Sequence, residues 1–585
     1  MVIPGKAGAE RAPLTGWLIQ LRGFGMLVRQ SSDNQERDVF IDAGDWTSRR
    51  LILAGDGVDY SIHDTTMKAG THTLLAYPHH LESAYCIEGE GELEDTVSGE
   101  RYPLKPGTLY SLNRSDRIRL HAETDVRLIC NLMPALAGTE KLDLEGGYPL
   151  VPEARPALRK KNVFVVNLNE FNLGRLKSIR NADNYNFLKL LDASDVLEQT
   201  HYDIDAILTK ARNTLQQYPG EVDGLIHYID FPVSTTVPIL CQEFGLPSAS
   251  LEAVLKCEHK FWSRYEQAQC IADHIPKFAA FDPFDDDALD GMGMAFPFWV
   301  KPIKSFSSYL GFRIDDREDW DHAIKEIRAH IGRFQGPFDA LLERVDMPAE
   351  VANIGGGDCI AESIIGGRMC TQEGFVHKGK LRVYGTVDSL REPNGSSFSS
   401  YQYPSRLPAR VRKRMTEIVE IFLSHIGYDN APFNVEFFWD ANTDRIWLLE
   451  VNPRISESHA DLFRKVDGAS HHEVSADLSL GARPRLPYRD GEFAYAGKFF
   501  IRSFRDAFVR SVPDGDALAE VARQVPDTIV RITCEPGKKL SELMDQDSYS
   551  YAMAIMWIGA SSPAKLQKNF EKAVELLDFD LEPIG

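Results

Sequence analysis

The sequence lacks any apolar run near the roughly 20 residues that a membrane-spanning helix needs. We therefore predict that the chain does not cross a membrane. An apolar stretch begins at Trp17, but Gln20 and Arg22 interrupt it and no small-residue cleavage site follows, so we predict no targeting signal. Residues 1–25 are expected to form a poorly ordered extension.

Cysteine is sparse and positive charge is in the minority. The eight cysteines are dispersed without a CxxC pair, which argues against a structural zinc site or a disulfide framework and favours a reducing cytoplasm. Lys and Arg number 65 against 86 Asp and Glu, so the formal net charge is -21. Because this charge repels a polyphosphate backbone and no large basic cluster offsets it, we do not expect a nucleic-acid partner.

The length of 585 residues predicts at least two folding units, since single cores stop growing near 300 residues. From 49 to 134, short apolar runs alternate with glycine and acidic turns, which is typical of a small β-barrel or sandwich. A proline-rich, basic segment at 152–161 precedes the buried-strand pattern at 163–166. We expect a barrel over 26–155 and a domain boundary near residue 155.

The remainder alternates helical and strand patterns, which indicates α/β layers. Residues 225–230 are predicted to form a strand and 234–244 a helix. Apolar residues at helical spacing over 410–426, followed by Gly427, predict an amphipathic helix with a buried stripe. The expected subdivisions are 160–250, 251–485 and 486–585.

Two predicted strands, 433–440 and 445–454, form a hairpin that carries acidic residues on one face. If the loop has an odd number of residues centred on Thr443, Glu436 lies opposite Glu450. Their repulsion would be relieved by Mg²⁺ (or Mn²⁺), which binds one or two carboxylates together with phosphate oxygens. Asn452 supplies a neutral oxygen for a second ion. The alternative is a two-sided hairpin whose acids are simply solvated.

The hairpin sequence resembles the metal-binding signature of the ATP-grasp ligases, and the resemblance extends upstream. It implies an α/β (α+β) ATP-grasp fold behind a Rossmann-like subdomain, with ATP as cofactor. Residues 296–302 resemble the family's phosphate-binding lysine strand, 305–311 its mobile loop and 359–367 its adenine hinge. The nucleotide contacts that the resemblance implies are Lys260, Lys301, Ser305, Ser307, Ser308, Glu362, Ile364 and Glu373.

Two features of this nucleotide region remain open. Met369 stands where the family often places a ribose-binding glutamate, and residues 342–345 form a rival hinge. In this family a carboxylate attacks the γ-phosphate of ATP and an amine then displaces phosphate. Arg454 is expected to clamp the phosphoryl group or the substrate carboxylate; the alternative is an ion pair with a neighbouring carboxylate. Ser456 and His459 are expected to face the substrate.

Residues 26–150 resemble ectoine synthase, a cupin enzyme, through the stretches 45–51, 80–95, 102–110 and 146–150. That family cyclises N-γ-acetyl-diaminobutyrate using iron held by a glutamate, a tyrosine and a histidine. Glu82 and Tyr110 match the first two ligands and are the implied catalytic residues, whereas Ile118 takes the place of the histidine. His121 lies at an odd offset along the strand and should face the other way. The resemblance therefore leaves open whether the barrel binds Fe²⁺.

Further residues match the lining of the ectoine synthase pocket: Trp46, Thr65, Tyr77, Cys130 and Glu140. A barrel with this lining could cyclise its ligand, bind a related amino acid, or only support a homodimer. His79 and His80 are interpreted as packing or surface residues. The cluster 471–473, with two histidines and a glutamate, is interpreted as an incidental feature of an exposed segment.

Three hypotheses follow. The leading one is a bifunctional enzyme in which a ligase joins an amino acid to a carboxylate and the cupin cyclises or binds a diaminobutyrate-like molecule. In the second, ectoine formation is the main activity and the ATP-grasp region is accessory. In the third, the cupin senses a ligand and controls the ligase.

Overall fold

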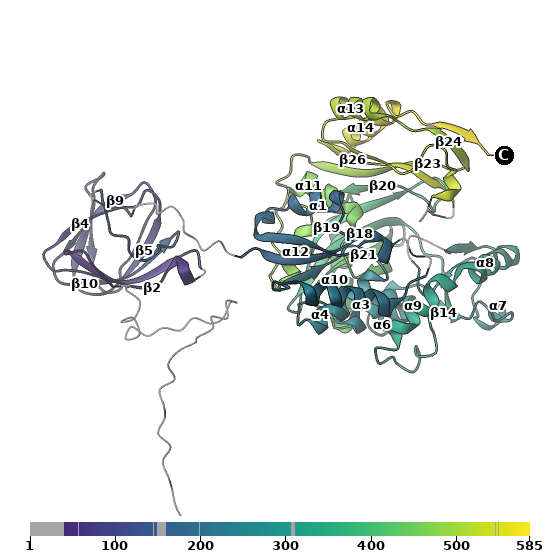
Figure 1. Ribbon diagram of the computed structural model, residues 1–585, viewed down its shortest axis with the longest axis horizontal. Helices are drawn as coiled ribbons and strands as arrows, with labels where there is room; N and C mark the ends of the chain where they lie inside the picture. The colour runs from purple at the N-terminus through teal and green to yellow at the C-terminus, as the bar shows by residue number, and fades with distance from the viewer. Residues whose placement is uncertain are drawn as a thin grey trace, which may run out of the picture. The chain divides into compact units, whose positions relative to one another are not determined.

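The computed structural model describes residues 40–585 except 57, 144, 149–158, 198, 200, 306–309, 544, 545, 548 and 585. The chain divides into two compact units, Met1–Arg159 and Lys160–Gly585 (Figure 1). The extension expected at 1–25 lies outside the described residues. No described helix combines the length and the apolar character needed to cross a membrane.

The first unit consists of two antiparallel sheets that enclose one core, which confirms the predicted all-β class. The sheet orders are β1-β2-β3-β10-β5-β8 and β4-β9-β6-β7. Alternate residues of each strand point inward, so Ala84 and Cys86 are fully buried while Tyr85 between them is exposed. The strands are β1 (Phe40–Asp42), β2 (Trp46–Ile52), β3 (Ser61–Met67), β4 (His72–Ala76), β5 (Leu81–Glu88), β6 (Gly91–Asp95), β7 (Arg101–Leu104), β8 (Leu109–Leu112), β9 (Arg117–Ala122) and β10 (Val126–Met133).

The second unit begins with a parallel sheet of order β12-β11-β13. Its strand β13 is shorter than the predicted 225–230, because the pairing with β11 ends at Ile226. The residues that follow form a loop before the helix predicted at 234–244. The elements are β11 (Lys161–Val166), α1 (Glu170–Lys177), β12 (Tyr185–Leu191), α2 (Ala193–Val196), α3 (Ile204–Gln217), β13 (Gly224–Ile226) and α4 (Val233–Glu243).

A four-stranded antiparallel sheet of order β14-β17-β15-β16 follows, with its own core. Trp320 of helix α8 packs into that core beside Phe281 and Phe298. The elements are α5 (Leu251–Glu258), α6 (Lys260–Cys270), β14 (Phe278–Phe281), α7 (Ala288–Gly291), β15 (Phe298–Pro302), β16 (Phe312–Ile314), α8 (Arg317–His330), α9 (Gly332–Leu342) and β17 (Cys359–Ser363).

An eight-stranded sheet of order β22-β21-β18-β19-β20-β23-β26-β25 dominates the rest of the unit (Figure 1). Strands from the last hundred residues therefore continue the sheet that carries the acidic hairpin. The elements are β18 (Arg368–His377), β19 (Lys380–Arg391), β20 (Phe398–Tyr403), α10 (Ala409–His425), β21 (Ala431–Asp440), β22 (Arg445–Asn452), α11 (Ala460–Asp467), α12 (His472–Ser479), β23 (Tyr495–Ser503), β24 (Ala507–Ser511), α13 (Gly515–Gln524), β25 (Ile529–Ile532), β26 (Tyr551–Ala560), α14 (Pro563–Glu575) and β27 (Asp580–Pro583).

Helix α10 matches the amphipathic helix predicted at 410–426. Its apolar stripe, including Val411, Met415 and Phe422, is fully buried against one face of the large sheet, at about 1.5–3 kcal/mol per large side chain. Gly427 ends the helix at φ +69°, a left-handed conformation that glycine adopts at little cost. Packing on this face leaves the acidic residues of β21 on the opposite face.

Candidate functional site

The acidic hairpin brings Glu436 of β21 opposite Glu450 of β22. The predicted pairing is therefore present, but the assumed loop is wrong. Asp440 pairs with Arg445, so the loop has four residues, an even number, and a β-bulge shifts the register between Glu436 and Phe437. The bulge leaves one extra residue, Leu449, on β22 and so restores the pairing of the two acids.

The two carboxyl groups differ in their electrostatic surroundings. Burial and the charge of Glu450 raise the pKa of Glu436 to about 7. Burial also acts to raise the pKa of Glu450, but Lys260, Lys301 and Lys304 outweigh it and hold that pKa below its usual value. The Lys260 ammonium lies 3.3 Å from Glu450 Oε1. Two facing acids beside several cations form a suitable environment for a divalent ion and phosphate.

A hydrogen-bond chain runs from the hairpin into the core of the sheet. Asn452 donates from Nδ2 to Asn434 Oδ1 at 3.1 Å, and Asn434 Nδ2 donates to Glu373 Oε1 at 2.6 Å. His459 Nδ1 lies 2.8 Å from the same Glu373 oxygen. Glu373, expected to contact the nucleotide, is fully buried and orients these two side chains. Asn452 uses its amide nitrogen here, and its amide oxygen remains for a cation.

The predicted phosphate lysines lie beside the predicted hinge acid. Lys301 Nζ is 2.8 Å from Glu362 Oε2, and Arg264 Nε donates to Glu362 Oε1 at 2.6 Å. Burial acts to raise the pKa of Glu362, but Arg264 and Lys301 lower it to about 2. Glu362 is thus ionised and already paired. Lys260 Nζ donates to the carbonyl of Ser305 at 2.7 Å.

The other residues predicted to contact the nucleotide lie at the ends of elements. Ile364 is 39% exposed in the turn that joins β17 to β18. Ser305 is buried, whereas Ser307 and Ser308 lie outside the described residues. The rival hinge at 342–345 is the end of helix α9, where Glu343 is exposed.

Arg454 makes a two-point ion pair with Asp230, with distances of 2.7 and 2.8 Å. The alternative considered from sequence, pairing with a carboxylate, is the arrangement observed, and that carboxylate comes from the loop after β13. Burial acts to raise the pKa of Asp230, but Arg454 and Lys304 hold it below its usual value. Lys304 itself pairs with Glu258 and lies over the Phe231 ring.

Sequence reasoning did not identify Asp230, Arg264, Glu258 or Lys304. A usable signal existed for Asp230, since an acidic residue soon after a buried parallel strand lies at the sheet edge where ligands commonly bind. The other three are recognisable only from burial, which the chain pattern does not reveal.

The predicted substrate residues follow Arg454. Ser456 is half-buried, and His459 is 2% exposed with its ring 5.0 Å from that of Tyr401. The interpretation of 471–473 as an exposed segment is wrong. His471 and His472 are fully buried, because α12 packs against β13 and β21, and Glu473 pairs with Arg180. No group of three or more His, Cys, Asp or Glu suited to a metal occurs in the part of the chain that the structure describes.

The barrel of the first unit encloses a second candidate site around Glu82. Burial raises the pKa of Glu82 to about 7, although Cys130, Tyr77 and Tyr110 interact with it and lower it. Tyr110 lies close enough to Glu82 to lower its pKa, but neither Glu82 Oε2 nor the Tyr110 hydroxyl, both buried, has a described partner in hydrogen-bond geometry. Unsatisfied buried groups of this kind favour a bound ligand.

The other predicted lining residues also point inward. Trp46 is 5% exposed, and Thr65 Oγ1 lies 2.9 Å from Ser48 Oγ. Glu140 is not free, because it pairs with Arg50 at 3.1 Å and accepts from the backbone N–H groups of Ala137 and Gly138. Three further inward residues were missed: Arg50, His63 and Tyr148. Burial lowers the pKa of His63 to about 3, so it is neutral.

The described residues do not fit the three-ligand iron site that the resemblance implies. Ile118 is buried in the apolar core and offers no donor atom. His121 faces outward, as predicted, with Nε2 2.8 Å from Glu94. His79 is exposed, and His80 packs inside with Nδ1 2.9 Å from the carbonyl of Pro134. Of the three implied ligands, the two oxygen donors, Glu82 and Tyr110, are present.

Comparisons with known proteins identify both units. Residues 26–152 match the family model for ectoine synthase, and residues 294–460 match the ATP-grasp domain. L-ectoine synthase from Desulfatibacillum aliphaticivorans is 45% identical over 130 residues, which cover 22% of this chain and 100% of that protein. The Oceanobacillus iheyensis enzyme is 45% identical over 128 residues, again 22% of this chain and 100% of that protein.

Two solved structures resemble the larger unit. An L-amino acid ligase from Bacillus licheniformis has a TM-score of 0.54 at 16% identity. The alignment covers 72% of this chain and 99% of that protein. An N5-carboxyaminoimidazole ribonucleotide synthetase in complex with ADP has a TM-score of 0.50 at 12% identity. The alignment covers 72% of this chain and 97% of that protein. These likenesses show the fold. Residues 26–152 thus belong to the ectoine synthase family, and the second unit has an ATP-grasp fold.

Proposed function

We propose that residues 160–585 are an ATP-dependent ligase that phosphorylates a substrate carboxylate and then joins the acyl phosphate to an amine. The observation that carries this proposal is the bulged pairing of Glu436 with Glu450, with Lys260 and Lys301 beside it. Opposed acids that are partly removed from water are costly unless a cation lies between them, and the adjacent lysines suit phosphate oxygens. The ATP-grasp match and the amino-acid ligase fold support the same reading.

Glu436, Glu450 and the amide oxygen of Asn452 would hold Mg²⁺ or Mn²⁺. The ion would supply charge neutralisation at the phosphate oxygens. Lys260 and Lys301 would bind phosphate oxygens of ATP, and Lys301 would leave its pair with Glu362 to do so. Glu373 would keep Asn434 and His459 in place behind these groups.

Arg454 would bind the transferred phosphoryl group or the substrate carboxylate. Its planar guanidinium already makes a two-point contact with Asp230, so the same geometry is available to a carboxylate or phosphate. Asp230 would then be released near the substrate, where it could accept a hydrogen bond from the amine. The substrates are an amino acid and a carboxylic acid, and we place the reaction in the cytoplasm.

The test is phosphate release from Mg-ATP by the full chain against pairs of amino acids, including diaminobutyrate and its acetylated form. Release that needs both members of a pair is the expected result. Glu420→Gln, an exposed glutamate of α10, is the matched control for a change at Glu450. Absence of release with every pair would contradict the ligase.

For the barrel, a second proposal is favoured by the unsatisfied buried oxygens of Glu82 and Tyr110. The barrel would bind N-γ-acetyl-diaminobutyrate or a related amino acid without the three-ligand iron site, because Ile118 cannot act as a ligand. Calorimetric titration of the acetylated compound tests this, with Glu82→Gln and the exposed Glu88→Gln as a matched pair. Saturable binding that Glu82→Gln weakens is expected; iron-dependent cyclisation by the unmodified chain would contradict it.

A further inference from the structure

One face of the large sheet carries both the metal carboxylates and a distant group of cations. Residues paired across neighbouring strands point to the same face, and so do residues two apart along a strand. Glu436 is therefore on the face of Phe438, two residues on. From there a row of paired residues crosses six strands to β26: Phe438, Met369, Ser389, Tyr401, Lys498 and Trp557.

Lys498 is a buried ammonium without a carboxylate partner. Only 6% of the residue is exposed, and its one hydrogen bond from Nζ is to Ser458 Oγ at 2.8 Å. Its ammonium lies 4.8 Å from the ring centre of Phe500 and 5.5 Å from that of Trp557. No described carboxylate is within ion-pair distance. A buried cation in this situation is costly, and aromatic faces offset only part of the cost.

Two arginines converge with Lys498 on the same indole ring. The guanidinium carbons of Arg175 and Arg531 lie 5.4 and 5.8 Å from the ring centre of Trp557. Arg175 pairs with Glu457 at 3.0 Å, but its Nη2 is buried without a partner. Arg531 has no ion pair among the described residues. Three cations around one ring thus share one carboxylate, and they repel one another.

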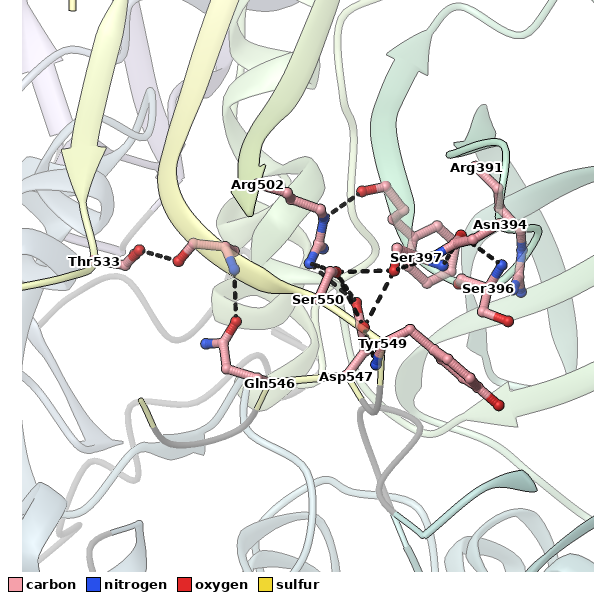
Figure 2. Close-up of polar contacts among 12 residues, drawn as sticks. Arg391, Asn394, Ser396, Ser397, Arg502, Thr533, Gln546, Asp547, Tyr549 and Ser550 are labelled. Carbon is pink, nitrogen blue, oxygen red and sulfur yellow. Dashed lines mark hydrogen bonds and ion pairs between the residues drawn. The ribbon is translucent and has the colours of Figure 1, made fainter. Parts of the chain in front are cut away.

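Two more arginines lie on this sheet, and Figure 2 labels both. The guanidinium carbon of Arg502 lies 4.7 Å from the ring centre of Phe500, which the Lys498 ammonium also faces. Arg502 pairs with Asp547 at 3.0 Å and donates to the carbonyl of Phe398 at 2.7 Å. Arg391 donates only to the carbonyls of Gly395 and Ser396 and to the sulfur of Met369, and its Nε is buried without a partner. Like Lys498, Arg391 has no carboxylate partner among the described residues. The excess of positive charge therefore extends along the sheet toward the hairpin.

We propose that these five residues, Arg175, Arg391, Lys498, Arg502 and Arg531, form an anion subsite of the ligase that binds a second acidic group of the substrate. This inference rests on the proposed ligase function. The group is a carboxylate or a phosphate, and it lies at the end of the substrate remote from the carboxyl that is phosphorylated. The unpartnered Arg175 Nη2 and Arg391 Nε are the donors that the anion would satisfy.

The position of the cluster defines the kind of substrate. Strands β21 and β23 are four steps apart in the sheet, about 19 Å along it, a gap that the long cationic side chains shorten. Tyr401 lies between the two regions: burial and then the charge of Glu436 raise the pKa of its hydroxyl, and its ring centre lies 5.7 Å from the Lys498 ammonium. The substrate is therefore elongated, on the scale of a dipeptide or an acylated amino acid. Free amino acids are too short to reach both sites, so they would react at the hairpin without using the subsite.

Anion binding by the full chain is the first test, with glutarate and inorganic phosphate as calorimetric probes. Lys498→Met should weaken binding at least about tenfold, because a buried charge partner is lost. Lys568→Met, an exposed lysine of α14, should leave binding unchanged. Arg531→Gln removes an exposed guanidinium, and a loss of about threefold is expected even if Lys498→Met folds poorly. Equal binding by the unmodified chain and both subsite variants would overturn the subsite.

Phosphate release with paired dipeptides is the second test: Glu-Ala against Gln-Ala, and phosphoserine-Ala against Ser-Ala, so that the second acidic group lies away from the C-terminal carboxyl. The acidic member should have a KM at least about tenfold lower, and Lys498→Met should abolish that preference while the KM for ATP is unchanged. The two pairs distinguish carboxylate from phosphate. Release without any acidic preference would overturn the subsite but not the ligase. Anion binding without release from any substrate would contradict the ligase and the substrate role together.

Discussion

The barrel and the large sheet each hold a glutamate whose pKa is raised to about 7, yet the two sites are built differently. Burial alone raises the pKa of Glu82, and the groups near it are neutral hydroxyls and a thiol. At Glu436 the like charge of Glu450 adds to burial, and lysines and arginines surround the pair. The second site is therefore equipped for phosphate and a divalent ion, whereas the first is equipped to hold a small polar ligand.

The largest effect is expected from Glu450→Gln in the hairpin. Removing one of the two opposed carboxylates should lower the rate of substrate-dependent phosphate release by about 10²–10³-fold, since charge neutralisation at the phosphates would be lost. Steady-state assays with Glu420→Gln as control measure this. A rate within about twofold of the unmodified chain would show that the pair is only structural.

The substitution Ile118→His tests the barrel half of this comparison. The unmodified chain should retain well under one iron per chain after anaerobic loading with Fe²⁺. The variant should retain nearly one iron per chain, about tenfold more, because the introduced histidine would supply the third donor atom. Metal analysis after gel filtration measures the ratio. Ile62→His, on the outer side of β3, is the control. One tightly held iron in the unmodified chain would contradict the account of the barrel.

Arg454→Lys tests whether the pair with Asp230 has a role beyond structure. Lysine keeps the charge but loses the planar two-point contact, so kcat/KM should fall about tenfold with little change in melting temperature. Arg505→Lys, at an exposed position, serves as the comparison. A lower melting temperature with unchanged kcat/KM would assign Arg454 a purely structural role.

The smallest effect concerns the pH dependence of stability at Lys498. Burial, with Arg531, Arg175 and Arg502 nearby and Glu457 opposing them, lowers its pKa to about 7. The unfolded chain then binds the extra proton between pH 7 and about 10.5, so the cost of the buried charge is full below pH 7 and disappears as pH rises. Lys498→Met should therefore raise the free energy of unfolding by about 1–3 kcal/mol at pH 6.5 and by little near pH 10.

Denaturant titrations at the two pH values measure that difference, with Lys568→Met as control. The same increase in the free energy of unfolding at both pH values would show that Lys498 remains charged throughout and is already paired. A saturating anion should reduce the gain at pH 6.5, which ties this measurement to the proposed subsite.

Alternation along strands made the acidic face of the hairpin predictable, and helical spacing made α10 predictable. The bulge at Leu449 was not, because one extra residue in a strand depends on backbone pairing that neither strand reveals alone. The pair Arg454–Asp230 joins residues 224 positions apart. The buried cluster at 471–473 looked exposed because Arg180, the partner of Glu473, is 293 positions away in sequence. Local patterns predict faces, whereas tertiary contacts determine which charges meet.

The most direct test of the central claim is to trap the activated carboxylate with hydroxylamine in place of the amine substrate. The account predicts a hydroxamate of the acid substrate, formed with an equal amount of ADP, dependent on Mg-ATP and absent in Glu450→Gln. Formation of AMP and pyrophosphate with the hydroxamate, or hydroxamate formation that survives Glu450→Gln, would contradict carboxylate activation by phosphorylation at this hairpin.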